Sequence, residues 1–128
     1  MEITAFAKVL IIMNNYFHDV ATAMLFSSAL IVWLLGRRVE RDGGDAAAWF
    51  PGAYATLSSI AKWSIVWIVV GGIPRTIFFG DVEWNMADPS NKYLFTALMI
   101  KHALMWIFVI AGSVMWLRIR KVAKATVA

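Results

Sequence analysis

Three long stretches of apolar residues constrain this chain more than any other feature of its sequence. They run from about 16 to 36, 53 to 79 and 93 to 117. Each has about the 20 residues that an α-helix needs to cross a bilayer. Only 16% of the 128 residues are charged, against about a quarter in a typical soluble domain. We therefore predict an all-α integral membrane bundle of three transmembrane helices, forming one domain over residues 1–128.

The boundaries of the three spans leave one question open. The segment ITAFAKVLIIM precedes the first span and is also apolar. It either continues the first helix beyond the membrane surface or lies flat as an interfacial helix. Pro51 suits the first turn of the second helix, and Pro74 is expected to kink or end that helix. We expect RRVERDGGDAAAW and GDVEWNMADPSNK to be the connecting loops.

The distribution of lysine and arginine predicts the orientation of the chain. Eight of these residues flank the first connector or follow the third span: Arg37, Arg38, Arg41, Lys62, Arg118, Arg120, Lys121 and Lys124. Four lie on the other side: Lys8, Arg75, Lys92 and Lys101. Cytoplasmic segments of membrane proteins carry the excess of positive residues. We therefore expect a multi-pass protein of a bacterial inner membrane, with the N-terminus outside and the C-terminus in the cytoplasm.

Several kinds of chemistry are excluded by the residues that the sequence lacks. The chain has no cysteine, which excludes disulfides, iron–sulfur clusters and covalently attached c-type haem. It has no glycine-rich phosphate loop, nucleophile elbow or HExxH zinc motif. The basic segment RIRKVAK is explained by topology and anionic headgroups, so we expect no nucleic acid partner. An independent enzyme is not expected, although a subunit of an oxidoreductase is compatible with these absences.

The two histidines are the strongest candidates for a functional site. His18 lies 18 residues before Gly36, about 27 Å along a helix, and His102 lies 15 residues before Leu117, about 22 Å. The first and third spans run in the same direction, so the two imidazoles should lie at similar depth. A b-type haem needs such a pair on neighbouring helices. We therefore predict that His18 and His102 are the axial ligands of a haem b.

The residues around the histidines fit this prediction but also have a simpler explanation. The neighbours of His18 at helical spacing are mostly small, and those of His102 are mostly bulky: Ala21, Thr22, Leu25, Ser28 and Ala29, then Phe95, Leu98, Met99, Met105, Trp106, Val109 and Gly112. Two such walls would admit a flat macrocycle, whereas small residues alone more often indicate close helix packing. Arg75, Lys101 and Asn15 or Asn14 are candidates for binding the haem propionates.

Charged residues also lie beside both histidines. Asp19 and Lys101 are each adjacent to a histidine in the sequence, at matching depth. We expect them to form an ion pair, because charges inside a membrane are partnered. Proton transfer through Asp19 is the functional alternative.

The third span carries a resemblance to known membrane proteins. Its sequence, TALMIKHALMWIFVIAGSVMWLRI, opens an apolar helix with a Lys-His pair. It resembles the corresponding helix of CopD-like membrane proteins, in which such a histidine is associated with haem or copper. The plan of three spans with histidines on two of them is similar to the membrane anchors of succinate dehydrogenase-type complexes. The resemblance implies that His102 is a ligand.

The sequence thus favours a haem-b protein that relays electrons between a quinone and a partner on the outer side. We expect it to work in a larger respiratory or photosynthetic complex, or as a homo-oligomer. One alternative is a cofactor-free accessory or scaffold subunit. Another is a copper-handling or transport protein, with a copper route through His18, Asp19, Met99 and Met105.

Overall fold

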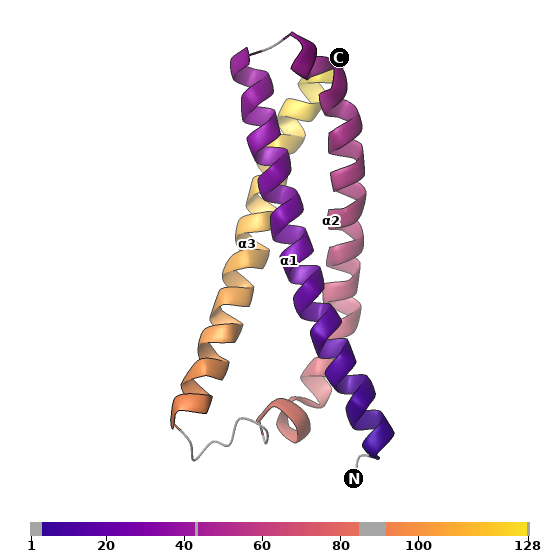
Figure 1. Cartoon of the computed structure of the whole chain (residues 1–128), viewed down its shortest axis with the longest axis vertical. Helices are drawn as coiled ribbons and strands as arrows, with labels where there is room; N and C mark the ends of the chain where they lie inside the picture. The colour runs from indigo at the N-terminus through magenta and orange to yellow at the C-terminus, as the bar shows by residue number, and fades with distance from the viewer. Residues whose placement is uncertain (1–3, 43, 85–91, 128) are drawn as a thin grey trace.

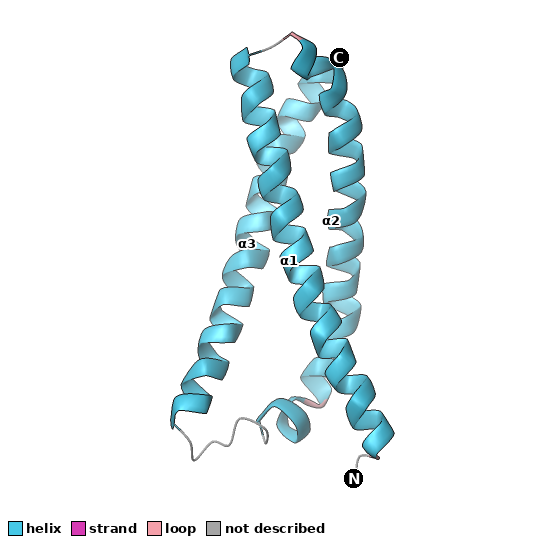
Figure 2. Ribbon diagram, viewed as in Figure 1, coloured by secondary structure: helices cyan, strands magenta, loops and turns pink. Residues whose placement is uncertain are grey.

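Three long helices and one short helical turn make up the described chain. The computed structural model describes residues 4–42, 44–84 and 92–127. Its elements are α1 (Ala5–Asp42), α2 (Asp45–Ile77), the π-helical turn η1 (Gly80–Trp84) and α3 (Lys92–Val127). Figure 2 shows helices over nearly all of this part of the chain, with short loops between them. Each of the three long helices is long and apolar enough to cross a membrane. The predicted all-α bundle of three transmembrane helices is therefore confirmed.

The helices extend further than the apolar stretches that predict them. α1 runs without a break from Ala5 to Asp42, so the segment before the first span continues the same helix and is not a separate interfacial helix. α1 also continues through the arginines that follow the span, and α2 begins at Asp45. The first connector is therefore much shorter than predicted. Gly44 has a φ of 60° there, which is a conformation that glycine adopts without steric strain.

Of the two prolines of α2, one lies where it was predicted and the other does not. Since α2 begins at Asp45, Pro51 lies inside the helix, and its predicted place in the first turn was wrong. The preceding Asp-Ala-Ala-Ala sequence favours a helix, and Asp45 stabilises the helix N-terminus through the helix dipole. Pro74 lies in the last turn of α2, and its carbonyl accepts a hydrogen bond from Phe78 N at 3.0 Å. The helix therefore ends close to Pro74, as predicted.

The helix α1 is the central element of the bundle. Both α2 and α3 pack against it, and they diverge from each other toward one end (Figure 1). In the most apolar 18-residue window of each helix, the buried share is 39% in α1, 22% in α2 and 0% in α3. We call the end where the helices converge the basic end (residues 36–54 and 116–124). The opposite end, where α2 and α3 diverge, is the open end (residues 5–26, 65–84 and 92–113).

A small hydrophobic core closes the bundle at the basic end. Its buried members are Val32, Val39, Phe50, Ile119 and Ala123. Gly36 makes this contact possible, because a Cβ atom there would overlap the side chain of Ile119. Beside the core, the rings of Tyr54 and Trp116 stack with centroids 5.8 Å apart. The three helices are therefore fixed at this end, and the open end is held by different interactions.

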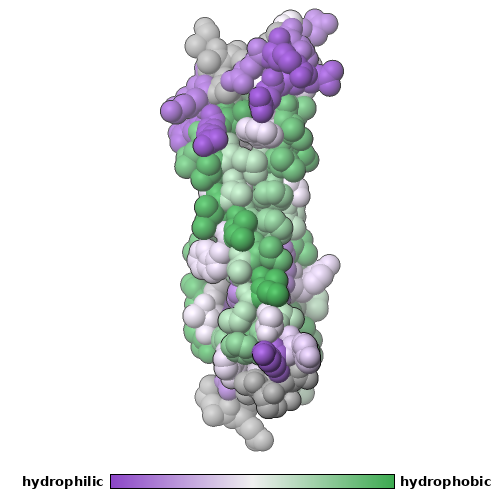
Figure 3. All heavy atoms as spheres, turned by 90° about the vertical axis from the view of Figure 1, so that its left-hand side faces the viewer, coloured by the Kyte–Doolittle hydropathy of each residue, from purple (hydrophilic) through white to green (hydrophobic). Residues whose placement is uncertain are grey.

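The surface of the bundle matches a lipid environment. In Figure 3 a hydrophobic belt covers the middle of the visible face, and hydrophilic residues gather at the basic end. Large apolar side chains are exposed on the surface of the bundle, including Trp63, Val69 and Trp106. Such exposure is costly in water, whereas in a bilayer these side chains contact hydrocarbon.

Candidate functional site

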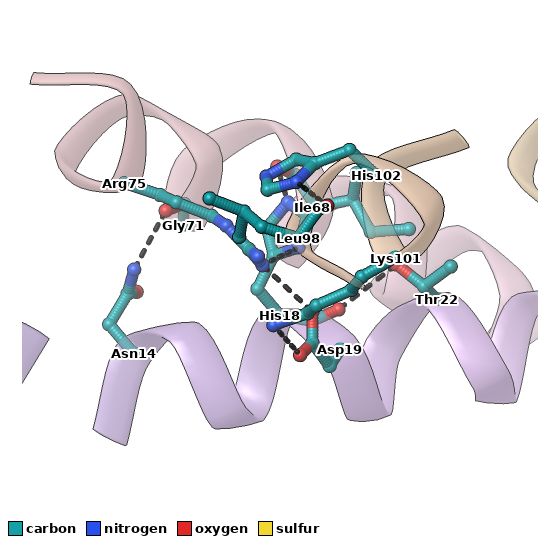
Figure 4. Close-up of polar contacts among 10 residues, drawn as sticks. All are labelled: Asn14, His18, Asp19, Thr22, Ile68, Gly71, Arg75, Leu98, Lys101 and His102. Atoms are coloured by element: carbon teal, nitrogen blue, oxygen red, sulfur yellow. Dashed lines mark hydrogen bonds and ion pairs between the residues drawn. The ribbon is translucent and has the colours of Figure 1, made fainter. Parts of the chain in front are cut away.

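His18 is buried between α1 and α2, with both ring nitrogens in hydrogen bonds. Its side chain is 4% exposed. Nε2 donates to the carbonyl oxygen of Ile68 at 3.1 Å, and Nδ1 accepts from Nη1 of Arg75 at 3.2 Å (Figure 4). A carbonyl oxygen can only accept, so the hydrogen is on Nε2 and the neutral ring offers Nδ1 as the acceptor. His18 therefore joins α1 to α2 as a neutral imidazole.

One carboxylate beside His18 links all three helices. Asp19 Oδ1 accepts a hydrogen bond from Arg75 Nη1 at 2.8 Å, and Asp19 Oδ2 is 2.9 Å from Lys101 Nζ. Arg75 comes from α2 and Lys101 from α3 (Figure 4). The predicted ion pair of Asp19 with Lys101 is confirmed, and Arg75 completes a three-residue cluster. This cluster holds the open end together, because charges at this depth favour internal partners over lipid.

A polar contact one turn earlier on α1 strengthens the same interface. Asn14 Nδ2 donates to the carbonyl oxygen of Gly71 at 2.8 Å. A Cβ atom at Gly71 would lie 3.1 Å from Asn14 Oδ1, so glycine allows this close approach of α1 and α2. Asn15, the preferred sequence candidate, does not line the cavity described below. Its Oδ1 is buried and has no hydrogen-bond partner among the described residues.

His102 makes a hydrogen bond within its own helix. Its Nδ1 donates to the carbonyl oxygen of Leu98, 2.8 Å away on the same helix. In the neutral form of the ring, this hydrogen bond places the hydrogen on Nδ1, which is the tautomer of histidines that bind a metal through Nε2. The ring meets that of Phe79 edge to face, with centroids 5.5 Å apart. Phe79 lies between α2 and η1 and covers one side of the imidazole.

Both histidines line a single cavity at the open end. It has a volume of about 910 Å³ and is lined mostly by α2 and α3, with His18 and Leu25 from α1. Arg75 contributes to its polar wall, and most other lining side chains are apolar, among them Ile68, Val69, Ile73, Met105 and Trp106. Several of these apolar residues are also exposed on the outside of the bundle, including Val69 at 62% and Trp106 at 62%. The cavity therefore opens sideways toward lipid.

The structure separates the predicted site residues into three groups. His18, His102 and Arg75 line the cavity. Lys101 lines a neighbouring groove on the other side of the Asp19 cluster, and Asn15 lines neither. The helix rise predicts the depth of a side chain, but its direction around the helix axis depends on packing.

The small residues of α1 do not form the expected cavity wall. Ala21, Ser28 and Ala29 are buried and do not line the cavity, whereas Leu25 does. The interpretation of Ala21, Ser28 and Ala29 as residues of close helix packing is therefore the correct one. On α3, the bulky wall is confirmed in part, since Met105, Trp106 and Val109 line the cavity.

The α2 wall and Phe79 are the parts of the site that the sequence did not reveal. Residues 65–73 of α2 are apolar or glycine throughout, so no periodicity distinguishes the cavity face of this segment from its lipid face. The Gly71-Gly72 pair was the available signal, because glycines in membrane helices allow close approach. A Cβ atom at Gly72 would lie 3.6 Å from Nε2 of His18.

The arrangement does not assemble a site for a bare metal ion within the residues that the structure describes. No group of three or more His, Cys, Asp or Glu side chains is close enough there to hold one. Met99 is 39% exposed and does not line the cavity. Asp19 is held by Arg75 and Lys101. Of the residues in the copper alternative, His18 and Met105 line the cavity, and Asp19 and Met105 line the neighbouring groove. This alternative stays a prediction.

Comparisons with known proteins add no family to these observations. No protein-family model, curated protein or solved structure matches this chain. The resemblance of the third span to CopD-like proteins stays a prediction. Function therefore has to be inferred from the residues of the cavity and the cluster themselves.

Proposed function

We propose that this protein is a membrane haem-b electron-transfer protein with His18 and His102 as axial ligands. One observation carries the proposal: two histidines from different helices line the same largely apolar cavity of about 910 Å³. That volume lies at the upper end of the range for ligand pockets, about 300–1,000 Å³. A haem needs a large flat apolar space with a donor nitrogen on each face.

The two histidines fit a haem to different degrees. His102 already has the required tautomer, because its Nδ1 donates to Leu98. His18 donates from Nε2 to Ile68, so ligation through that nitrogen requires its ring to leave the Ile68 carbonyl. One such hydrogen bond contributes about 1 kcal/mol. Metal ligation by Nε2 would offset this loss.

The remaining residues of the site have supporting roles in the proposal. Arg75 supplies positive charge for the haem propionates, whereas Lys101 lies in the neighbouring groove. The walls from α2 and α3 exclude water, and Phe79 holds the His102 ring. A bound haem supplies one-electron redox chemistry, whose potential is set by the axial ligands, burial and nearby charge.

The cellular setting follows from the same proposal. With the basic end in the cytoplasm of a bacterial inner membrane, the cavity lies toward the outer side. The protein would then pass electrons between a quinone and an outer-side partner, within a larger respiratory or photosynthetic complex or a homo-oligomer. No residue in the most apolar window of α3 is buried within the chain, which leaves this helix open to partner chains as well as to lipid.

Titration of haem into the purified detergent-solubilised protein tests the proposal. We expect saturation at one haem per chain with a low-spin spectrum in the native protein. His18→Ala and His102→Ala should each lose the low-spin spectrum. Met99→Ala is the matched control, because Met99 lies on the same helix just before His102 but outside the cavity. Absence of saturable binding in the native protein would refute the proposal.

A cofactor-free accessory subunit is the second candidate, and one observation favours it. Both ring nitrogens of His18 already bind α2, which is a sufficient structural reason for this histidine. This candidate predicts that the protein isolated with its natural partners is colourless. It also predicts that His102→Leu assembles with those partners as the native chain does.

A further inference from the structure

A second hollow lies on the other side of the Asp19 cluster, between α1 and α3. This groove has a volume of about 590 Å³, which is within the range of ligand pockets. Asp19 and Lys101 line its polar part, and Phe26 and Phe108 line its apolar part. Met105 lines both this groove and the main cavity. The groove therefore has a polar region, an apolar region and a wall shared with the candidate haem cavity.

The polar region of the groove can both donate and accept hydrogen bonds. Lys101 Nζ lies 2.9 Å from Asp19 Oδ2, and the two side chains are 46% and 38% exposed. An ammonium group has three N–H donors, and a carboxylate accepts several hydrogen bonds. The pair thus keeps capacity for a ligand while it remains intact. A complementary ligand has an acceptor oxygen for Lys101 and a hydroxyl for Asp19.

The depth of the ion pair selects the class of ligand. Asp19 lies 17 residues before Gly36, about 26 Å, and Lys101 lies 16 residues before Leu117, about 24 Å. Arginines follow both reference residues and mark the basic end of the spans. In a hydrocarbon core of about 30 Å, the pair therefore lies several ångströms inside the opposite boundary. A phospholipid phosphate stays outside the hydrocarbon, whereas a quinone ring dissolves in it.

The apolar region suits the tail of such a molecule. Phe26 and Phe108 each lie seven residues beyond their charged neighbour, about 10 Å deeper in the membrane. Their rings stack with centroids 4.9 Å apart and an interplanar angle of 28°. The groove therefore runs from a hydrogen-bonding pair near the boundary to an aromatic pair deeper in the bilayer.

We propose that this groove binds a membrane-dissolved quinone or quinol. Lys101 donates to a carbonyl oxygen of the ring, Asp19 accepts from a quinol hydroxyl, and the isoprenoid tail lies along Phe26 and Phe108. Binding depends only on the groove. A redox role for the bound quinone rests on the proposed function, because its partner would be a haem in the main cavity. Met105 lies in the wall that the groove and the main cavity share.

The test is equilibrium binding of a two-isoprene naphthoquinone to the protein in nanodiscs, with and without added haem. Lys101→Met should weaken binding about tenfold, as expected for the loss of one charge-assisted hydrogen bond, and Lys101→Arg should retain most of the affinity. Lys8→Met is the matched control, because Lys8 is exposed and lies outside the groove. Phe108→Leu should weaken binding without removing the ion pair. Its effect therefore distinguishes the loss of a groove contact from disruption of the helix packing.

An azido derivative of the same quinone locates the site by mass spectrometry. Labelling of α1 and α3 residues around Phe26 and Phe108 supports the proposal, whether or not haem binds. Unchanged affinity in both Lys101→Met and Phe108→Leu overturns it, and so does labelling confined to the main cavity. Labelling of the groove by an azido phospholipid that the quinone cannot displace also overturns it. Haem titration on the same samples reports separately on the proposed function.

Discussion

Replacement of Asp19 by asparagine should loosen the open end of the bundle. Asp19 forms an ion pair with each of the other two cluster residues, at 2.8 Å to Arg75 and 2.9 Å to Lys101. Asparagine keeps the size of the side chain but removes its charge. Because the ion pairs join α1 to α2 and α1 to α3, this single change weakens both helix contacts.

The size of the effect follows from the two contacts and their exposure. Hydrogen bonds to charged groups contribute about 1.5–3 kcal/mol each when buried, and interhelical hydrogen bonds in membranes average about 0.6 kcal/mol with a maximum near 1.7. The Asp19 side chain is 38% exposed, and asparagine can still accept one hydrogen bond. We therefore expect Asp19→Asn to lower the free energy of unfolding by about 2 kcal/mol, or about 30-fold in the equilibrium constant.

Unfolding in mixed micelles by titration with sodium dodecyl sulfate measures this difference. Asp42→Asn is the matched control, because Asp42 also pairs with two cations, Arg38 and Arg41, but at the exposed basic end. Exposed ion pairs contribute little, so the control should unfold as the native protein does. If Asp19→Asn is no less stable than Asp42→Asn, the cluster does not hold the open end together.

Three further predictions use the same unfolding measurement. His18→Ala should lower the free energy of unfolding by about 2 kcal/mol, because it removes two interhelical hydrogen bonds. His102→Ala should lower it less, because the His102 ring bonds its own helix. Equal losses in the two variants would contradict this assignment. Gly36→Val should lower the free energy of unfolding by about 1–3 kcal/mol, because the new side chain overlaps Ile119. Adding Ile119→Ala should restore part of this stability. If it restores none, the overlap is not the cause. Phe50→Ala should lower the free energy of unfolding by about 3–5 kcal/mol, because Phe50 is 0% exposed. A decrease below about 1 kcal/mol would contradict the place of Phe50 in the core.

The three helices could be predicted because a membrane permits few alternatives. Each apolar stretch must satisfy its backbone hydrogen bonds within itself, so it has to be a helix. Hydropathy locates the apolar part of each helix, but it does not predict how far the helix continues beyond the membrane into water. Residues 37–42 and 45–49 are helical, although we predicted a connecting loop there.

The candidate site could be predicted in depth but not in direction. The fixed rise of an α-helix places His18 and His102 at one level, and both line one cavity. It also places Lys101 and Asn15 near that level, yet neither faces the cavity. The rotation of each helix follows from packing contacts such as Gly71 with Asn14, which no single-sequence pattern specifies.

The charged cluster was predictable in part for the same reason. The pairing of Asp19 with Lys101 follows from matched depth and the need for charges to be partnered in a membrane. The third member, Arg75, lies near the end of α2 beyond Pro74. Its partner depends on how the last turn of α2 is rotated, so the sequence suggested a propionate ligand and not an ion pair with Asp19.

Near-infrared magnetic circular dichroism of the oxidised protein, isolated from its native membrane in mild detergent, tests the central proposal most directly. The position of the charge-transfer band identifies the axial ligands of a low-spin ferric haem. We predict a bis-imidazole band in the native protein, accompanied by a sharp visible α-band on reduction with dithionite, and the loss of both in His18→Ala and in His102→Ala. A folded protein that carries no haem when isolated with its partners, or a haem whose signature survives both replacements, would contradict the account.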